Sequence, residues 1–304
     1  MRVVYRGDFD GSVCAAILIE LGKCDELVQY HPQDVQDDKV EITDQDIICN
    51  LPYNPNCHMW FDHHSSEIGK IDFSAIFAGT ARIAPSAARL VYEYFEKELT
   101  SPAKYEQLVA EADLVDGGFI TVHQLAEPRG ITLLALLLDP RTGLGLSHDY
   151  SISNFQWSIK IPELLTTHTI DQILCMPDTE ERINKYREME AKAKEFYSEN
   201  SYLDGNVIVS DVRGKSIPVG NRFLIYALPG LMDGNISVRI SDGKEKKFYT
   251  INVAHSIVNS TSLVDAGKLC REYRGGGHER AAACQVSIED SDRVLKEIID
   301  ACKG

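Results

Sequence analysis

Short apolar runs alternate with helical periodicity in the first half of the chain. Four such runs are typical of buried strands, at residues 2–5, 27–31, 46–50 and 58–61. Residues 11–21 place Val13 and Ile17 on one face at helical spacing, and residues 85–95 and 105–114 repeat that spacing. Because strands separated by helices pair in parallel, the pattern predicts an α/β domain built on a parallel sheet.

The second half of the chain has a different pattern. Residues 179–200 are rich in strong helix formers and charged residues, which predicts an exposed connecting helix. Strand candidates are then grouped, at residues 207–212, 223–227, 236–240 and 248–253. Helical patterns at 262–272 and 291–302 flank a glycine-rich loop and another strand. Grouped strands predict a smaller α+β domain with a mixed sheet. The predicted division is residues 1–178, a connecting helix and linker at 179–204, and residues 205–304.

Composition and length agree with two domains. The chain has 304 residues, of which 44% are hydrophobic, and a chain of that length usually splits into domains. A membrane span needs about 20 consecutive apolar residues, and the sequence has no such run. The first residues begin a strand and carry no signal-peptide pattern. We therefore expect a cytoplasmic protein with no membrane partner, and the eight cysteines, which form no Cys-x-x-Cys pair, are interpreted as reduced packing residues.

The net charge restricts the class of substrate. A formal charge of −15 disfavours binding to duplex nucleic acid, which requires a basic face. A phosphate-bearing substrate must therefore be bound locally, by a metal ion and a few arginines.

Polar residues follow three of the predicted strands where each strand ends. Asp8 and Asp10 follow the first strand, Asn50 ends the third, and the triplet Asp62-His63-His64 ends the fourth. The carboxyl ends of parallel strands meet at one edge of a sheet, where ligands bind. Carboxylate and imidazole groups together indicate a metal site at this edge.

A glycine motif in the second half offers a second binding element. Arg274 is followed by Gly275, Gly276, Gly277 and His278. Consecutive glycines allow the backbone to approach a ligand, and their N–H groups can bind an anion. We expect His278, the next residue, to contact the same anion.

Together these motifs resemble the DHH family of phosphoesterases with its DHH-associated C-terminal domain. The resemblance covers nearly the whole chain. The family includes single-strand exonucleases, oligoribonucleases, cyclic-dinucleotide phosphodiesterases and polyphosphate-degrading enzymes. An exopolyphosphatase-related branch is the most similar, through the segments at residues 6–11, 50–53 and 60–67. The resemblance implies hydrolysis of a phosphoester with manganese, or alternatively magnesium, as the metal.

In that family, four motifs hold two divalent ions. The first ion uses a histidine that is absent here, since Val4 and Arg6 occupy its two usual spacings, together with Asp8 and a bridging aspartate that is Asn50 in this chain. The second ion uses Asp10, the bridging residue, His63 and an acidic residue after the helical segment. Asp113 matches this last ligand, with Asp116 as a competing assignment.

Both departures fall on the first ion's ligands. The resemblance therefore implies about one ion per chain, with Asn50 a weak ligand. A guanidinium is always charged, so Arg6 could hold a phosphate where the first ion would lie.

The resemblance also implies roles for residues that do not bind metal. His64 would contact the phosphate, and Asp62 would orient an imidazole. Arg239 and Asn259 lie where the family often places further phosphate or base contacts.

The expected function is hydrolysis of a small phosphoester in a cleft between the N-terminal sheet and the glycine motif. A short single-stranded oligonucleotide, a nucleotide and polyphosphate all remain open, as does a homodimer. Two alternatives remain beside it. One is a regulatory protein that binds a phosphate ligand without turnover, and the other is a one-metal phosphatase.

Overall fold

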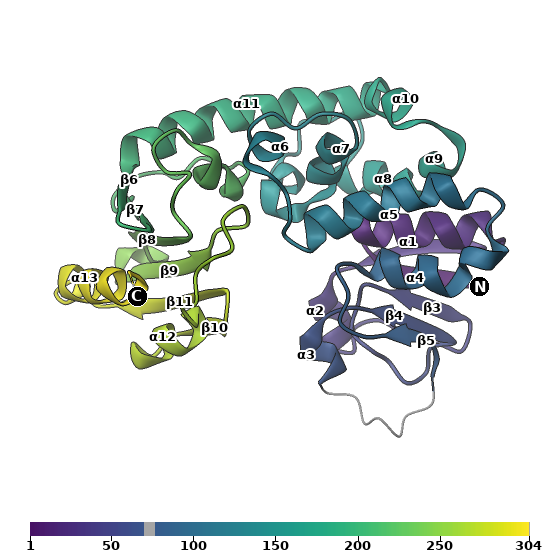
Figure 1. Cartoon of the computed structure of the whole chain (residues 1–304), viewed down its shortest axis with the longest axis horizontal. Helices are drawn as coiled ribbons and strands as arrows, with labels where there is room; N and C mark the ends of the chain where they lie inside the picture. The colour runs from purple at the N-terminus through teal and green to yellow at the C-terminus, as the bar shows by residue number, and fades with distance from the viewer. Residues whose placement is uncertain (70–76, 304) are drawn as a thin grey trace. The chain divides into compact units, whose positions relative to one another are not determined.

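A computed structural model describes residues 1–69 and 77–303. The chain divides into two compact units (Figure 1). The first contains Met1–Phe119 and Pro128–Tyr186, and the second contains Ile120–Glu127 and the chain from Arg187 onward. In the described part, no helix is both long and apolar enough to cross a membrane.

The first unit contains a parallel five-stranded sheet, as the alternating pattern predicts. Its strand order is β2-β1-β3-β4-β5. The strands are β1 Arg2–Arg6, β2 Glu26–Tyr30, β3 Asp46–Cys49, β4 Met59–Asp62 and β5 Ala78–Ala81. The sequence pattern misses β5, because Ala78-Gly79-Thr80-Ala81 has no large apolar residue.

Helix α1 (Phe9–Glu20) is the centre of this unit. Its residues from Phe9 to Leu18 are all buried, and it packs against α4, α5, α7 and α9. Figure 1 shows α1, α4 and α5 together on one face of the sheet. The other helices of the unit are α2 Pro32–Gln36, α3 Ser65–Ile68, α4 Ala87–Phe95, α5 Pro102–Asp116, α7 Gly130–Leu138, α8 Asn154–Ser158, α9 Ile161–Thr167 and α10 Ile170–Leu174. Because α1 is enclosed by its neighbours, the polar residues at its start are also buried.

The predicted connecting helix is α11 (Pro177–Asn200), which begins in the first unit and ends in the second, and residues 201–204 of the predicted linker form a strand. The second unit also contains the short helix α6 (Val122–Ala126) and a mixed six-stranded sheet of order β10-β11-β9-β8-β7-β6. Its strands are β6 Ser201–Asp204, β7 Val207–Asp211, β8 Ile236–Asp242, β9 Tyr249–His255, β10 Gly276–His278 and β11 Ala281–Val286. Of the described strands in this sheet, β7 and β8 pair in parallel and the others pair antiparallel.

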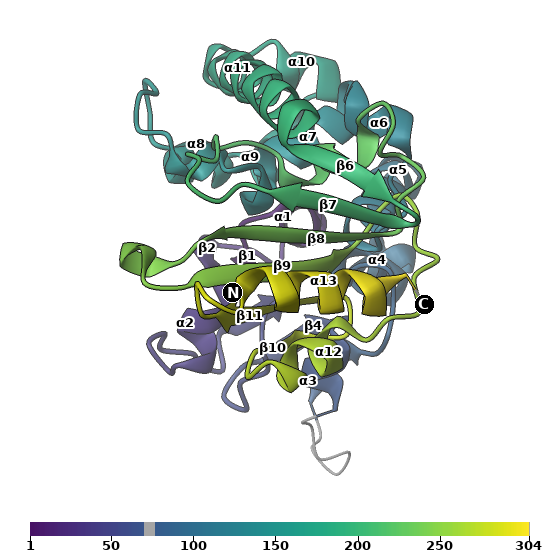
Figure 2. The same cartoon turned by 90° about the vertical axis from the view of Figure 1, so that its left-hand side faces the viewer.

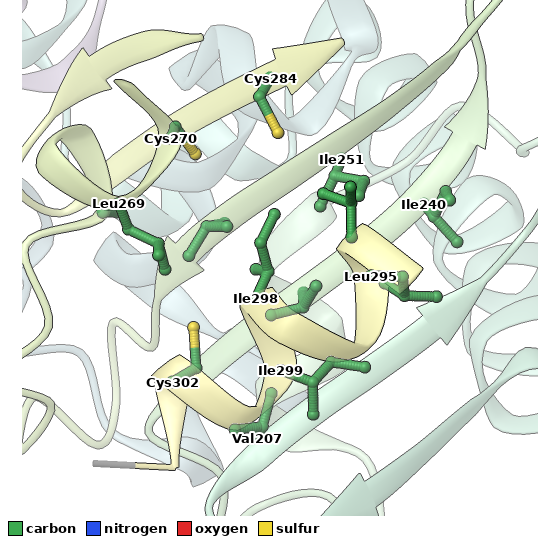
Figure 3. Close-up of a cluster of buried hydrophobic side chains, with 14 of the residues drawn as sticks. Val207, Ile240, Ile251, Leu269, Cys270, Cys284, Leu295, Ile298, Ile299 and Cys302 are labelled. Atoms are coloured by element: carbon green, nitrogen blue, oxygen red, sulfur yellow. The ribbon is translucent and has the colours of Figure 1, made fainter. Parts of the chain in front are cut away.

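Helices α12 (Ala266–Glu272) and α13 (Ser291–Cys302) cover one face of this sheet (Figure 2). Alternate residues of β7, β8 and β9 point into the core between the sheet and these two helices, where Ile298 of α13 is fully buried. Figure 3 shows this cluster, in which Cys270, Cys284 and Cys302 pack among Val, Ile and Leu side chains. The cysteines are free and those three are buried.

Two local predictions in this unit are wrong. Residues 223–227 are not a strand but lie in a 3-10 helix, Arg222–Ala227, which Asn221 caps by accepting a hydrogen bond from the Phe223 N–H (3.0 Å). A short buried apolar run has no periodicity that separates a strand from a helical turn. The glycine motif is not a loop but forms the edge strand β10, paired with β11.

Candidate active site

The start of α1 positions two buried carboxylates at the carboxyl end of β1. Asp8 caps the helix, and its side chain accepts a hydrogen bond from the Gly11 N–H (2.9 Å). Asp10 accepts hydrogen bonds from the N–H groups of Ala87 (2.9 Å) and Ala88 (2.7 Å), at the start of α4. Two helix N-termini therefore hold the two carboxylates, which are 7% and 2% exposed.

Asp8 is engaged on both of its oxygens. Arg6 Nε lies 2.8 Å from Oδ2, and the Asn50 amide donates to Oδ1 (3.2 Å) and Oδ2 (3.4 Å). Asn50 is fully buried and has a φ of 55°, a conformation that asparagine tolerates. Its Oδ1 has no hydrogen-bond partner in the described part of the chain. Burial raises the pKa of Asp8, and the positive charge of Arg6 opposes that increase.

His63 faces two carboxylates. Its Nδ1 lies 3.0 Å from the Ala84 carbonyl, which orients the ring. Its Nε2 lies 2.9 Å from Asp116 Oδ2 and 3.7 Å from Asp10 Oδ2, yet makes no hydrogen bond of normal geometry with a described residue. Such an arrangement suits a cation placed between the three groups.

The pKa values reflect this crowding of charge. Burial, together with the nearby charge of Asp116, raises the pKa of Asp10 to about 7. Burial by itself would lower the pKa of His63, but Asp116 and Asp10 raise it to about 9. Without a bound cation, protons are therefore retained at this cluster.

The aspartate beside His63 is Asp116. Asp113, the first assignment for this ligand, is held elsewhere: its carboxylate accepts hydrogen bonds from Arg89 Nε (2.9 Å) and Nη2 (2.6 Å) and from the Ser86 hydroxyl (2.6 Å). The two aspartates are three residues apart on α5, so sequence spacing does not separate them.

Asp62 and His64 form a pair beside this cluster. His64 Nδ1 lies 2.8 Å from Asp62 Oδ1, and Asp62 is fully buried. The pair fixes the ring of His64, whose side chain is 37% exposed. His63, His64 and Asp116 each place one ligand atom within 4.8 Å of the others. Asn50, Asp62 and His64 also line an open pocket of about 340 Å³.

A second, narrow pocket lies on the side of Asp8 and Asp116. Its lining includes two residues that no sequence motif indicated, Asp139 and Arg141. Arg141 binds the Asp139 carboxylate through Nε (2.8 Å) and Nη2 (2.6 Å). The sequence signal is weak, since Asp-Pro-Arg after a buried helix is also a common cap.

Comparison with solved structures identifies the family. The chain is 36% identical to the pGpG-specific phosphodiesterase PggH of Vibrio cholerae, with a TM-score of 0.86 and coverage of 99% of this chain and 98% of that one. The chain belongs to the DHH family of phosphoesterases. An exopolyphosphatase-related protein of Bacteroides fragilis (12% identity, TM-score 0.52, 99% and 92% coverage) and the DHH domain of a ribosomal-protein family member (12% identity, TM-score 0.58, 99% and 86% coverage) share its fold. No protein-family model and no curated sequence matches the chain.

The chain is therefore a phosphoesterase, and its cluster fits one of the DHH family's two ions. Asp10, His63 and Asp116 supply carboxylate oxygens and one imidazole nitrogen, and His63 Nε2 makes no hydrogen bond of normal geometry with residues 1–69 or 77–303 that an ion would have to break. Oxygen and nitrogen donors of this kind suit manganese or magnesium. The residues of the other DHH site do not fit an ion, because Arg6 and the Asn50 amide already bind the carboxylate oxygens of Asp8.

The second unit holds the remaining predicted residues. Gly275 and Gly277 must be glycine, because a Cβ would lie 2.2 Å from the Ala283 carbonyl oxygen and 2.5 Å from that of Ala281. His278 is exposed at the end of β10.

Cross-strand register places Arg239 on the same row as Gly276. The row runs Arg239, Asn252, Ala283, Gly276, so these residues share one face of the sheet. Arg239 Nη1 lies 3.4 Å from the Tyr197 hydroxyl, and its Nε is buried with no hydrogen-bond partner among the described residues.

The side chain of Asn259 makes two hydrogen bonds within its own turn. Its amide donates to the Asp233 carbonyl (3.1 Å), and its side-chain oxygen accepts from the Thr261 hydroxyl (2.8 Å). The structure therefore gives Asn259 a local structural contact.

Proposed function

We propose that this enzyme is a phosphodiesterase that hydrolyses short linear dinucleotides such as pGpG into mononucleotides. The observation that carries the proposal is 36% identity along almost the entire length of a pGpG-specific phosphodiesterase. The cluster of Asp10, His63 and Asp116 supports metal-dependent chemistry at the same time.

We infer that one manganese ion, with magnesium as the alternative, binds to Asp10, His63 and Asp116. When bound, such an ion polarises the phosphate and lowers the pKa of a water molecule. Asn50 Oδ1, which lacks a hydrogen-bond partner in the described chain, is a further weak ligand.

The neighbouring residues bind and orient the substrate. Asp62 holds the His64 ring through Nδ1, so that Nε2 can donate a hydrogen bond to a phosphate oxygen. Arg6 lines the pocket beside Asp8 and binds the phosphate with its remaining N–H groups. In the second unit, the candidate substrate contacts are the glycine strand, His278 and Arg239.

Asn50 and the missing histidine support a second candidate, a protein that binds a dinucleotide without hydrolysing it. Both candidates predict binding, and only the first predicts products.

A substrate panel tests the proposal. Purified protein with manganese is incubated with pGpG, pApA, longer oligonucleotides, cyclic dinucleotides and polyphosphate, and products are separated by chromatography. We expect GMP from pGpG at a higher kcat/KM than from any longer substrate. Faster release of phosphate from polyphosphate would refute the assignment. Tight binding of pGpG without product would establish the binding protein instead.

A further inference from the structure

We propose that Arg6 and Arg141 together replace the first divalent ion of the DHH site, forming an arginine pair that binds the phosphate of the substrate. The inference rests on the proposed function for the identity of that substrate. It assigns a role to Arg141, which no sequence motif marks.

The first step is the state of Asp8. In a two-ion site this residue would bind the first ion. Here its Oδ1 accepts from the Gly11 N–H (2.9 Å) and from the Asn50 amide (3.2 Å), and its Oδ2 lies 2.8 Å from Arg6 Nε. A divalent ion at this carboxylate would have to displace an amide and a guanidinium from a side chain that is 7% exposed.

The second step is the position of Arg141. Asp139, which is 5% exposed, caps the turn Pro140–Thr142 and receives both the backbone N–H (2.7 Å) and the guanidinium of Arg141. This double contact fixes the guanidinium at the pocket that Arg6 also lines. The charge of Asp8 raises the pKa of Arg6, and the positive charge of Arg141 opposes that increase.

The third step is the charge of the pocket. Its described lining includes four carboxylates, Asp8, Asp10, Asp116 and Asp139, and two arginines. When these are ionised, one divalent ion brings the formal charge to zero. In the substrate-free pocket, a second divalent ion would leave two excess positive charges in a partly buried site, which is costly. The pocket is therefore balanced for one ion and two arginines.

The chemistry of arginine suits this role. A guanidinium is always charged and has five N–H donors in a planar fork that matches the oxygens of a phosphate. Unlike a metal ion, it cannot generate hydroxide. In this arrangement the single ion must activate water, while the pair holds the phosphate and stabilises the charge that develops on it.

The pair is tested with Arg6→Gln and Arg141→Gln, and Arg2→Gln is the matched control. Arg2 lies at the opposite end of β1 and binds Asp46 through Nε and Nη2, both at 2.6 Å. Binding of inorganic phosphate to the manganese-loaded proteins is measured by titration calorimetry. A hydrogen bond to a charged group contributes enough that each pocket variant should weaken phosphate binding about tenfold or more. Arg2→Gln should not change it, and unchanged affinity in both pocket variants would refute the pair.

The number of bound metal ions per chain is an independent test of the arginine pair. Elemental analysis of dialysed protein should give about one manganese per chain for the wild type, Arg6→Gln and Arg141→Gln. The double variant Arg6→His, Asn50→Asp frees Asp8 and supplies an imidazole and a carboxylate, so it should bind two. If that variant does not fold, Asn50→Asp alone should raise the affinity for a second ion. Two tight ions in the wild type would overturn the proposal.

These measurements separate the pair from the proposed function. If pGpG is not hydrolysed but the arginine variants lose phosphate affinity, the pair stands and the substrate assignment fails. If pGpG is hydrolysed and the arginine variants keep their phosphate affinity, the substrate assignment stands and the arginine pair is refuted.

Discussion

At the scale of single residues, the site depends on which polar atoms are already paired. Asp8 and Asp113 are both engaged by arginine contacts, whereas Asp10 and Asp116 both lie near His63 Nε2. Like charges in a buried cluster raise pKa values and favour a bound cation. An arginine partner, rather than residue type, therefore distinguishes Asp8 and Asp113 from the carboxylates that are available to a metal ion.

The two aspartates of α5 give the first prediction. Asp116→Asn should lower manganese affinity and turnover by about tenfold to a hundredfold, since it removes a charged ligand next to His63. Asp113→Asn should lower the melting temperature through loss of its contacts with Arg89, and leave metal binding intact. Calorimetry with manganese and a thermal melt distinguish the two. Loss of metal in the Asp113 variant alone would reverse the assignment.

His63 gives the second prediction. His63→Ala should reduce both manganese affinity and turnover about a hundredfold or more, because the carboxylates alone hold the ion poorly. His58→Ala is the matched control, as His58 is exposed just before β4. Normal kinetics in the His63 variant with the metal bound would exclude it as a ligand.

The raised pKa values give the third prediction. In metal-free protein, the pKa of His63 is raised from 6.5 to about 9, so the stability it contributes is present below pH 6.5 and is lost as the pH rises through 9. The pKa of Asp10 is raised from 3.8 to about 7, so the stability that Asp10 contributes is likewise lost as the pH rises from 3.8 through 7. Manganese must displace these protons, so its affinity should increase from about pH 6 to about pH 9. Melting temperatures with EDTA and with manganese across this range check both trends. A metal-induced stabilisation that shrinks with pH would contradict them.

The residues of the site were only partly predictable. Asp8, Asp10 and the DHH triplet follow strands, and the end of a parallel strand is visible in the hydrophobic pattern. Asp139 and Arg141 follow the apolar run of α7, which marks a buried helix and not the end of a strand, so only the folded chain shows that they line the pocket.

At the scale of elements, helix starts and strand ends place the functional groups. The start of α1 fixes Asp8 and Asp10, and the start of α4 holds Asp10 by two backbone N–H groups. Strands β1 to β4 of the parallel sheet, most strands of the mixed sheet and helices α1, α4 and α5 were predictable from their apolar runs and spacing, although among these helices only α4 has a strongly one-sided apolar face. Residues 223–227 and β10 were not predictable, because a five-residue apolar run and a run of glycines show no hydrophobic periodicity.

The glycine strand gives the fourth prediction. Gly277→Ala should destabilise the protein by roughly 1–3 kcal/mol, because Gly277 has a φ of 143° and a Cβ there would lie 2.5 Å from the Ala281 carbonyl oxygen. Gly276→Ala is the control for stability, since a Cβ there meets nothing within 4 Å. Denaturant unfolding measures the difference. Equal stability of the two variants would show that β10 adjusts without strain.

At the scale of the whole molecule, chemistry and recognition are assigned to different units. Asp10, His63 and Asp116 belong to the first unit, whereas Arg239 and the glycine strand belong to the second. Each unit has its own sheet, and the second has a separate apolar core beneath α12 and α13. A substitution in the second unit can therefore alter substrate binding without altering the metal site.

The last prediction uses that separation. His278→Ala should raise KM, lower kcat or both, and leave manganese content at the wild-type value, because the proposed role of His278 is to contact phosphate and no ion. Glu279→Ala is the matched control, an exposed neighbour that follows the same strand. Steady-state kinetics with pGpG and elemental analysis of the same preparations measure the two effects separately. A fall in manganese content in the His278 variant would make this histidine a metal ligand, and the division of roles between the two units would then be wrong.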